Sequence, residues 1–138
     1  MMPSQSIWMI RSALLYLILS VSIGTIILIQ KVIDLHPFIW ALLPVHYEMA
    51  IWGWIVQLAM GTAYWMFPKK LDDPRRGPNW AGWLGFILFN MGLIFLVIST
   101  LFQSLIYAAY IGRGLLLISI LIFAVLMWQR IVTYRNHH

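Results

Sequence analysis

The sequence predicts an all-α membrane protein built as a bundle of four transmembrane helices. Of the 138 residues 62% are hydrophobic and only 9% are charged, whereas soluble domains carry about 25% charged residues. Four apolar stretches are long enough to cross a bilayer, which takes about 20 helical residues. None of them alternates with a period of two, as a half-buried strand would. A soluble enzyme and a disordered chain are therefore excluded.

We expect one membrane domain, residues 1–138, with four helices in order. Their expected ranges are 8–30, 44–67, 80–102 and 108–132. The first range resembles a signal peptide, but its apolar run is too long and no Ala-x-Ala pattern follows, so we interpret it as a helix. Pro44 suits the first turn of the second helix, where its missing N–H costs nothing. Pro68 ends that helix and opens the strongly polar segment 68–79.

The basic residues divide unequally between the two sides of the predicted bundle. Lys31 and Arg113 fall on one side. The other seven of the nine fall on the side that holds both termini: Arg11, Lys69, Lys70, Arg75, Arg76, Arg130 and Arg135. The positive-inside rule therefore predicts that both termini are cytoplasmic. We interpret the net charge of +5 as this orientation signal and expect no nucleic-acid partner.

The chain contains no cysteine. This excludes disulfides, iron–sulfur clusters, thiolate zinc sites and haem attached through a CxxCH motif. A metal or cofactor would have to be held by His, Met, Tyr, a carboxylate or the backbone. The sequence also lacks a phosphate-binding loop, a nucleophile triad and a catalytic carboxylate pair.

The second helix holds His46 and Glu48 at the start of an apolar span, where ionisable groups are costly and usually face a protein interior. At about 100° per residue, Gly53 and Gln57 lie within about 20° of His46, so this face has a slot beside the histidine. Another helix could fill the slot, or a flat cofactor ligated by His46 could. Glu48 lies about 200° away and faces either the membrane interface or a neighbouring chain.

The second helix also carries the one resemblance to a known family. Its residues are His46, Gly53, Trp54, Gln57, Leu58, Gly61, Ala63, Tyr64, Trp65, Phe67 and Pro68. This run resembles the second helix of the haem-copper oxidase subunit I superfamily, in particular its nitric oxide reductase and C-family branches. It is also similar to small four-helix bacterial relatives of that subunit. The resemblance implies that His46 is an axial metal ligand of a low-spin haem b.

The resemblance implies a function as well as a ligand. It points to a multi-pass, haem-binding protein of a bacterial or archaeal inner (plasma) membrane, serving electron transfer with a redox partner or binding a diatomic gas. Nothing resembles the helices that carry the copper ligands, so a complete oxidase enzyme is not expected. One alternative is a haem-free assembly or structural subunit of a larger respiratory complex. Another is a small channel lined by His46, Glu48 and Gln57.

A low-spin haem usually takes two strong axial ligands, and one chain offers one convincing candidate, His46. We interpret His36 as a solvated loop residue, and His137 and His138 as part of the terminal tail. Met49 and Met91 are further candidates, although methionine more often packs. Because the oxidase subunit resembles three four-helix groups around a pseudo-threefold axis, we favour a homotrimer in which each cavity receives His46 and a neighbour's Glu48. The rival is a homodimer sharing haem through two His46 residues. Arg113 either pairs with haem propionates or anchors its helix at the interface.

Overall fold

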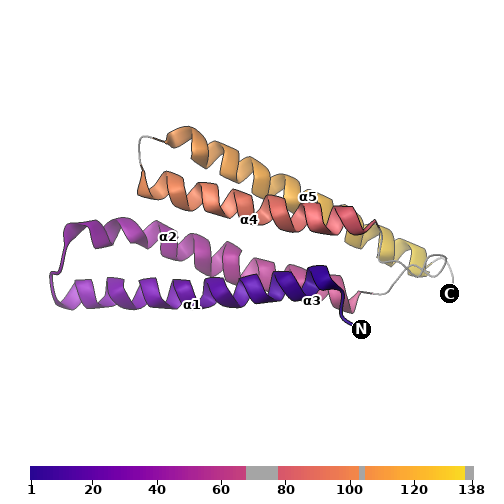
Figure 1. Ribbon diagram of the computed structural model, residues 1–138, viewed down its shortest axis with the longest axis horizontal. Coiled ribbons are helices and arrows are strands. Elements are labelled where there is room, and N and C mark those ends of the chain that lie inside the picture. Colours follow the sequence, from indigo (N-terminus) through magenta and orange to yellow (C-terminus); the bar gives the residue numbers. More distant parts are fainter. Residues whose placement is uncertain (68–77, 103–104, 136–138) are drawn as a thin grey trace.

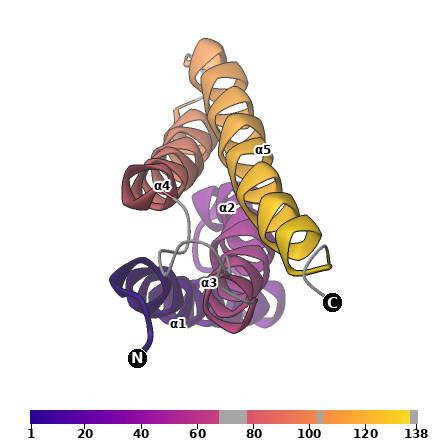
Figure 2. The ribbon, with the colours of Figure 1, turned by 90° about the vertical axis from the view of Figure 1, so that its right-hand side faces the viewer.

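A computed structural model describes residues 1–67, 78–102 and 105–135, without the side chains of 132–135. These residues confirm the predicted all-α, four-helix architecture: they contain four helices long and apolar enough to cross a membrane, and no strand occurs among them. The basic cluster predicted at 69–76 and the terminal histidines lie outside the described residues. The helices form two antiparallel hairpins that lie side by side (Figures 1 and 2).

The first hairpin pairs α1 (Ser4–Val32) with a segment, Pro37–Met66, that we name helix two. The second pairs α4 (Asn79–Leu101) with α5 (Ile106–Arg135). The start of α1 and the last described residues of α5 lie at one end of the bundle, which we name the terminal end (Figure 1). The opposite end holds the carboxyl ends of α1 and α4, and we name it the loop end.

Helix two consists of four consecutive parts. They are η1 (Pro37–Leu42), α2 (Leu43–Glu48), η2 (Met49–Val56) and α3 (Gln57–Met66). It begins seven residues before the expected 44, because His36 caps a 3₁₀ turn by accepting the Phe38 N–H at 3.1 Å. Pro37 supplies a pre-set φ at the first position of that turn. The η2 part is a π-helix, whose wider turn means that a uniform 100° per residue does not hold across it.

The face of α1 that meets helix two is made of small residues seven positions apart. Ser6, Ala13 and Ser20 are all buried, and their spacing keeps them on one side of the helix. In a membrane, small residues let two backbones approach closely, which gives packing and hydrogen bonds in place of a hydrophobic driving force. The Ser6 hydroxyl accordingly donates to the Gly61 carbonyl. A Cβ on Gly61 would lie only 2.9 Å from Met9 Cβ.

The second hairpin is packed through glycines in the same way. A Cβ on Gly92 would lie 2.8 Å from the Gly112 carbonyl oxygen, and a Cβ on Gly112 would lie 2.8 Å from that of Gly92. One further contact comes from Ser119, whose hydroxyl donates to the Gly85 carbonyl at 2.6 Å. The α4–α5 crossing therefore depends on backbone contact at Gly92 and Gly112.

Two clusters of buried side chains join the hairpins. The larger one draws from α1, α3, α4 and α5: Met9, Met60, Phe89, Leu96 and Leu116. Nearer the terminal end, Tyr64 packs with Ala81, Leu126 and Met127. Arg130 is 1% exposed there, donates to the Tyr64 carbonyl at 3.0 Å and lies 4.3 Å from the Tyr64 ring centroid.

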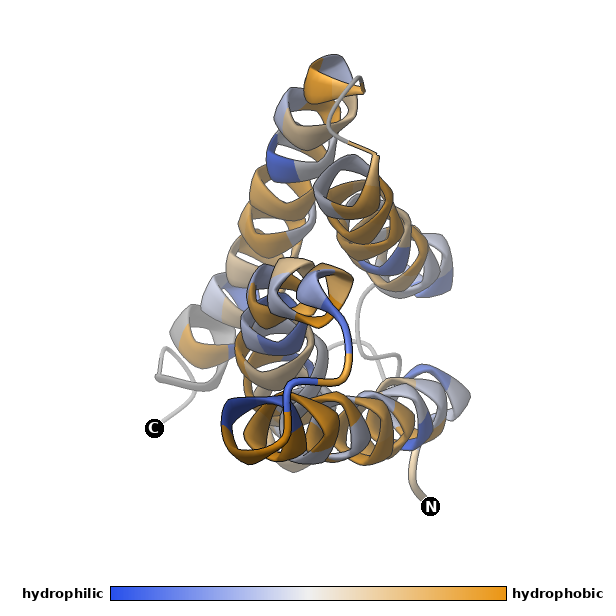
Figure 3. Ribbon diagram, turned by 90° about the vertical axis from the view of Figure 1, so that its left-hand side faces the viewer, coloured by the Kyte–Doolittle hydropathy of each residue, from blue (hydrophilic) through white to orange (hydrophobic). Residues whose placement is uncertain are grey.

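Most of the outer surface is apolar. Long side chains such as Ile18, Leu28 and Leu117 are exposed along the helices, and hydrophobic residues cover most of each helical ribbon (Figure 3). An exposed apolar surface of this extent is what a lipid-facing bundle presents.

Candidate functional site

His46 lies on α2 and packs against α1 near the loop end. Its Nδ1 is 2.8 Å from the Ser20 carbonyl oxygen and 3.1 Å from Ser20 Oγ, and the Ser20 hydroxyl donates to the His46 carbonyl at 3.2 Å. A carbonyl can only accept, so its bond with Nδ1 requires the proton to be on Nδ1. The lone pair of neutral His46 is then on Nε2.

Gly24 makes room for the His46 ring. A Cβ on Gly24 would lie 2.8 Å from His46 Cε1 and 3.1 Å from Nδ1. Ser20 and Gly24 stand one turn apart on α1, so one holds the ring and the other lets it lie flat against the helix. Neither residue was predicted from the sequence to contact His46. The available signal was their small-xxx-small spacing, which is typical of close helix contacts in membranes.

The His46 ring borders an open groove of about 370 Å³, which we name the His46 groove. Its lining comes from α1 and the start of helix two: Val21, Gly24, Thr25, Ile27, Leu28, Leu43, His46 and Tyr47. None of these residues belongs to α4 or α5, so the groove opens on the outside of the bundle. Among the described residues nothing bonds to Nε2, which leaves an imidazole nitrogen free beside apolar walls.

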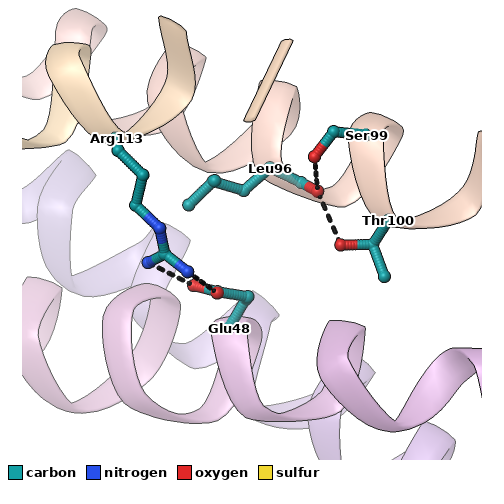
Figure 4. Close-up of polar contacts among 5 residues, drawn as sticks. All are labelled: Glu48, Leu96, Ser99, Thr100 and Arg113. Atoms are coloured by element: carbon teal, nitrogen blue, oxygen red, sulfur yellow. Dashed lines mark hydrogen bonds and ion pairs between the residues drawn. The ribbon is translucent and has the colours of Figure 1, made fainter. Parts of the chain in front are cut away.

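Glu48 points away from this groove and pairs with Arg113 of α5 (Figure 4). Arg113 Nη2 lies 2.5 Å from Glu48 Oε1, and Nη1 lies 3.3 Å from Oε2. The Glu48 side chain is 15% exposed and that of Arg113 is 55% exposed. Two parallel bonds neutralise a carboxylate that would be costly alone at the edge of an apolar span.

The nearby hydroxyls do not compete for Glu48. Those of Ser99 and Thr100 both donate to the Leu96 carbonyl of their own helix, at 2.8 and 2.9 Å (Figure 4). The Glu48–Arg113 pair was not among the alternatives raised from the sequence, which assigned Glu48 to the interface or a neighbour and Arg113 to propionates or the interface. The structure brings these two candidate residues together.

Gly53 and Gln57 lie apart from the His46 groove. A Cβ on Gly53 would lie 2.6 Å from Tyr16 Cγ, so α1 fills the slot on this face, as the helix-packing alternative requires. Gln57 is 1% exposed, and neither Nε2 nor Oε1 of its amide has a hydrogen-bond partner in the described part of the chain. Neither residue lines the groove.

Two further observations limit the chemistry. Across residues 1–67, 78–102 and 105–135, no group of three or more His, Cys, Asp or Glu side chains could hold a metal ion. His36 is exposed and serves as a cap. No cluster of such side chains therefore surrounds His46 in the described part of the chain.

Comparison of the chain with protein-family models, curated proteins and solved structures finds no significant match.

Proposed function

We propose that this protein is a membrane-embedded b-type haem protein in which His46 ligates the iron through Nε2. The observation that supports this most directly is the bond between Nδ1 and the Ser20 carbonyl. Histidines that ligate metals almost always donate their other ring N–H to a carbonyl, carboxylate or water, which fixes the tautomer and the ring orientation. The resemblance of residues 46–68 to the haem-copper oxidase helix supports the same ligand.

The His46 groove fits one side of such a cofactor. Its volume of about 370 Å³ is at the lower end of small-molecule sites, which span about 300–1,000 Å³. The lining is mostly apolar, and Gly24 leaves the ring accessible. In this proposal His46 binds iron, Ser20 orients the ring, and the apolar walls exclude water. Bound haem would supply one-electron transfer or diatomic gas binding.

Glu48 and Arg113 have a different role in this proposal. Because both terminal nitrogens of Arg113 bond to Glu48, we assign the pair to joining helix two with α5 rather than to the haem. Gly53 is assigned to helix packing against Tyr16. His46 thus remains as the ligand among the residues predicted from the sequence.

The placement in the membrane is part of the proposal. All four helices would cross an inner membrane with the terminal end in the cytoplasm, because seven of the nine basic residues fall on that side of the predicted bundle. The His46 groove then lies toward the outer leaflet, where a redox partner outside the membrane would exchange electrons with the haem.

The optical spectrum of the protein purified after expression with haem supplied tests this function. Wild type is expected to show a Soret band and a pyridine haemochrome of b type, and His46→Ala is expected to lose both. His36→Ala is the matched control, because it removes an exposed imidazole at the same end of the bundle. Wild-type protein without haem, or His46→Ala with undiminished haem, contradicts the proposal.

One alternative has structural support: a haem-free structural subunit of a larger membrane complex. Helix packing alone accounts for Gly53 and Gly61, and an ion pair accounts for Glu48 and Arg113. This alternative predicts that His46→Ala changes neither the spectrum nor the thermal stability, and that other subunits co-purify with the tagged chain.

A further inference from the structure

The His46 groove is one half of an axial site. Nε2 has no partner among the described residues, and the groove rim carries exposed Val21, Leu28 and Tyr47. A low-spin haem takes two strong ligands on opposite faces of its ring. The groove provides a wall and a ligand on one face only.

The described part of the chain offers no second ligand at this groove. Met49 lines a separate pocket of about 110 Å³ between the hairpins, with Tyr16 and Leu93 among its other walls. Met91 lies on α4, which contributes nothing to the groove lining. Glu48 is bonded to Arg113 within its own chain, so it is not free to enter a neighbour's cavity. A second ligand must then come from outside the described residues, and another copy of the chain can supply one.

Membrane geometry restricts which outside group can reach it. Copies inserted in the same direction are related by axes along the membrane normal, so His46 lies at the same depth in every copy. Around a two-fold axis, a surface of one copy contacts the same surface of the other copy. Around a three-fold axis, it contacts a different surface of the next copy. Only the two-fold places two His46 residues on opposite faces of one ring.

We infer that a second copy of this chain completes the site: the His46 grooves of two protomers face each other across a two-fold axis, and both His46 residues ligate one haem. This inference rests on the proposed function. It assigns the exposed rim of Val21, Thr25, Leu28 and Tyr47 to the contact between the copies. It also replaces the three-fold assembly favoured from the sequence.

Cross-linking tests the contact. Because the sequence has no cysteine, a single introduced thiol can be joined within the assembly only to its equivalent in another copy. Thr25→Cys, on the groove wall, is expected to give a cross-linked dimer when the haem-loaded protein is treated in membranes with a bifunctional maleimide long enough to reach past the haem. Ile111→Cys is the control, because Ile111 is also exposed at the loop end but lies on α5. Failure of Thr25→Cys to cross-link, or equal cross-linking of Ile111→Cys, overturns the inference.

Mixed oligomers test the ligation. Wild type and His46→Ala are co-expressed with different tags, and the mixed pair is isolated in two affinity steps. The pair is expected to hold haem with one protein imidazole, so its spectrum shifts from low spin to high spin, and added imidazole restores the low-spin form. If the mixed pair instead keeps a low-spin spectrum at half the haem content, each haem takes both ligands from one chain and the inference fails.

Stoichiometry separates this inference from the proposed function. Two chains and one haem, by detergent-corrected mass and haemochrome, support both. One haem per monomer, or a trimer, overturns the shared site while leaving His46 as a ligand. Wild-type protein that never binds haem overturns the proposed function itself.

Discussion

The position of the His46 ring depends on two residues of α1. The Ser20 carbonyl accepts from Nδ1 and fixes which nitrogen carries the proton. Gly24 keeps the space in which the ring lies. Neither contact involves a second titratable group. The histidine is oriented by a backbone carbonyl and by the space that the glycine leaves.

At this scale we predict that Gly24→Ala displaces His46. The added Cβ would lie 2.8 Å from Cε1, and overpacking of this kind costs about 1–3 kcal/mol. We expect a lower midpoint of unfolding in detergent and a shifted or weakened Soret band.

Gly114→Ala is the matched control for that variant. Nothing lies within 4 Å of a Cβ at Gly114, and alanine in place of an interior helical glycine stabilises by roughly 0.5–1 kcal/mol. If both variants behave alike, Gly24 has no special role at the ring.

Helix two contacts different neighbours on different faces. Its glycines meet α1, whereas Glu48 meets Arg113 on α5. The helical wheel correctly places His46 and Glu48 on different faces of helix two. His46 and Gly53 both contact α1, although the residues between them form part of a π-helix. The wheel could not identify the partner of Glu48. Helices that are apolar on nearly every side have no polar face to fix their rotation, so a contact across 65 residues is decided by packing.

The ion pair is expected to couple these two elements. In a double-mutant cycle of Glu48→Gln and Arg113→Gln, we predict a coupling free energy of about 1 kcal/mol, at the upper end for pairs that reach solvent. Reversible unfolding in mixed micelles gives the four stabilities. Lys31→Gln removes another cation at the loop end and should show no coupling to Glu48→Gln. Equal coupling would mean that overall charge, not the contact, matters.

Two of the three glycines of α4 should respond differently to alanine. At Gly92 a Cβ meets the Gly112 carbonyl oxygen at 2.8 Å, whereas at Gly85 the nearest atoms are 3.9 Å away or more. We therefore predict that Gly92→Ala destabilises the protein by about 1–3 kcal/mol. Gly85→Ala should be neutral or stabilise by up to roughly 1 kcal/mol. Thermal unfolding of the two variants, measured side by side, tests this prediction. An equal change in unfolding midpoint for both variants would contradict it.

The whole molecule is two tight hairpins joined by apolar packing and a few polar contacts. One is the bond from the Tyr16 hydroxyl to Asn90 Oδ1, at 3.1 Å, and another is Arg130 on the Tyr64 carbonyl. Arg130 was counted from the sequence as a charge that orients the protein. The structure shows that it is also buried and bonded at the end of α3.

The direction of insertion is a prediction at this scale. Ser4 and His36 are exposed at opposite ends of α1. With a membrane-impermeant maleimide on intact cells, we expect labelling of His36→Cys and none of Ser4→Cys until the membrane is opened, because the basic residues concentrate at the terminal end. The reverse pattern would invert the topology. Labelling of both variants from outside would contradict a spanning α1.

Local composition and helical length are enough to predict the all-α class, the four apolar helices and the unusual position of His46. The neighbours of those residues become known only when the helices are packed: Ser20 and Gly24 for His46, Arg113 for Glu48, and Tyr16 for Gly53. The physical reason is that helix rotation and register in a nearly uniform apolar chain are set by close contacts between small residues far apart in the sequence.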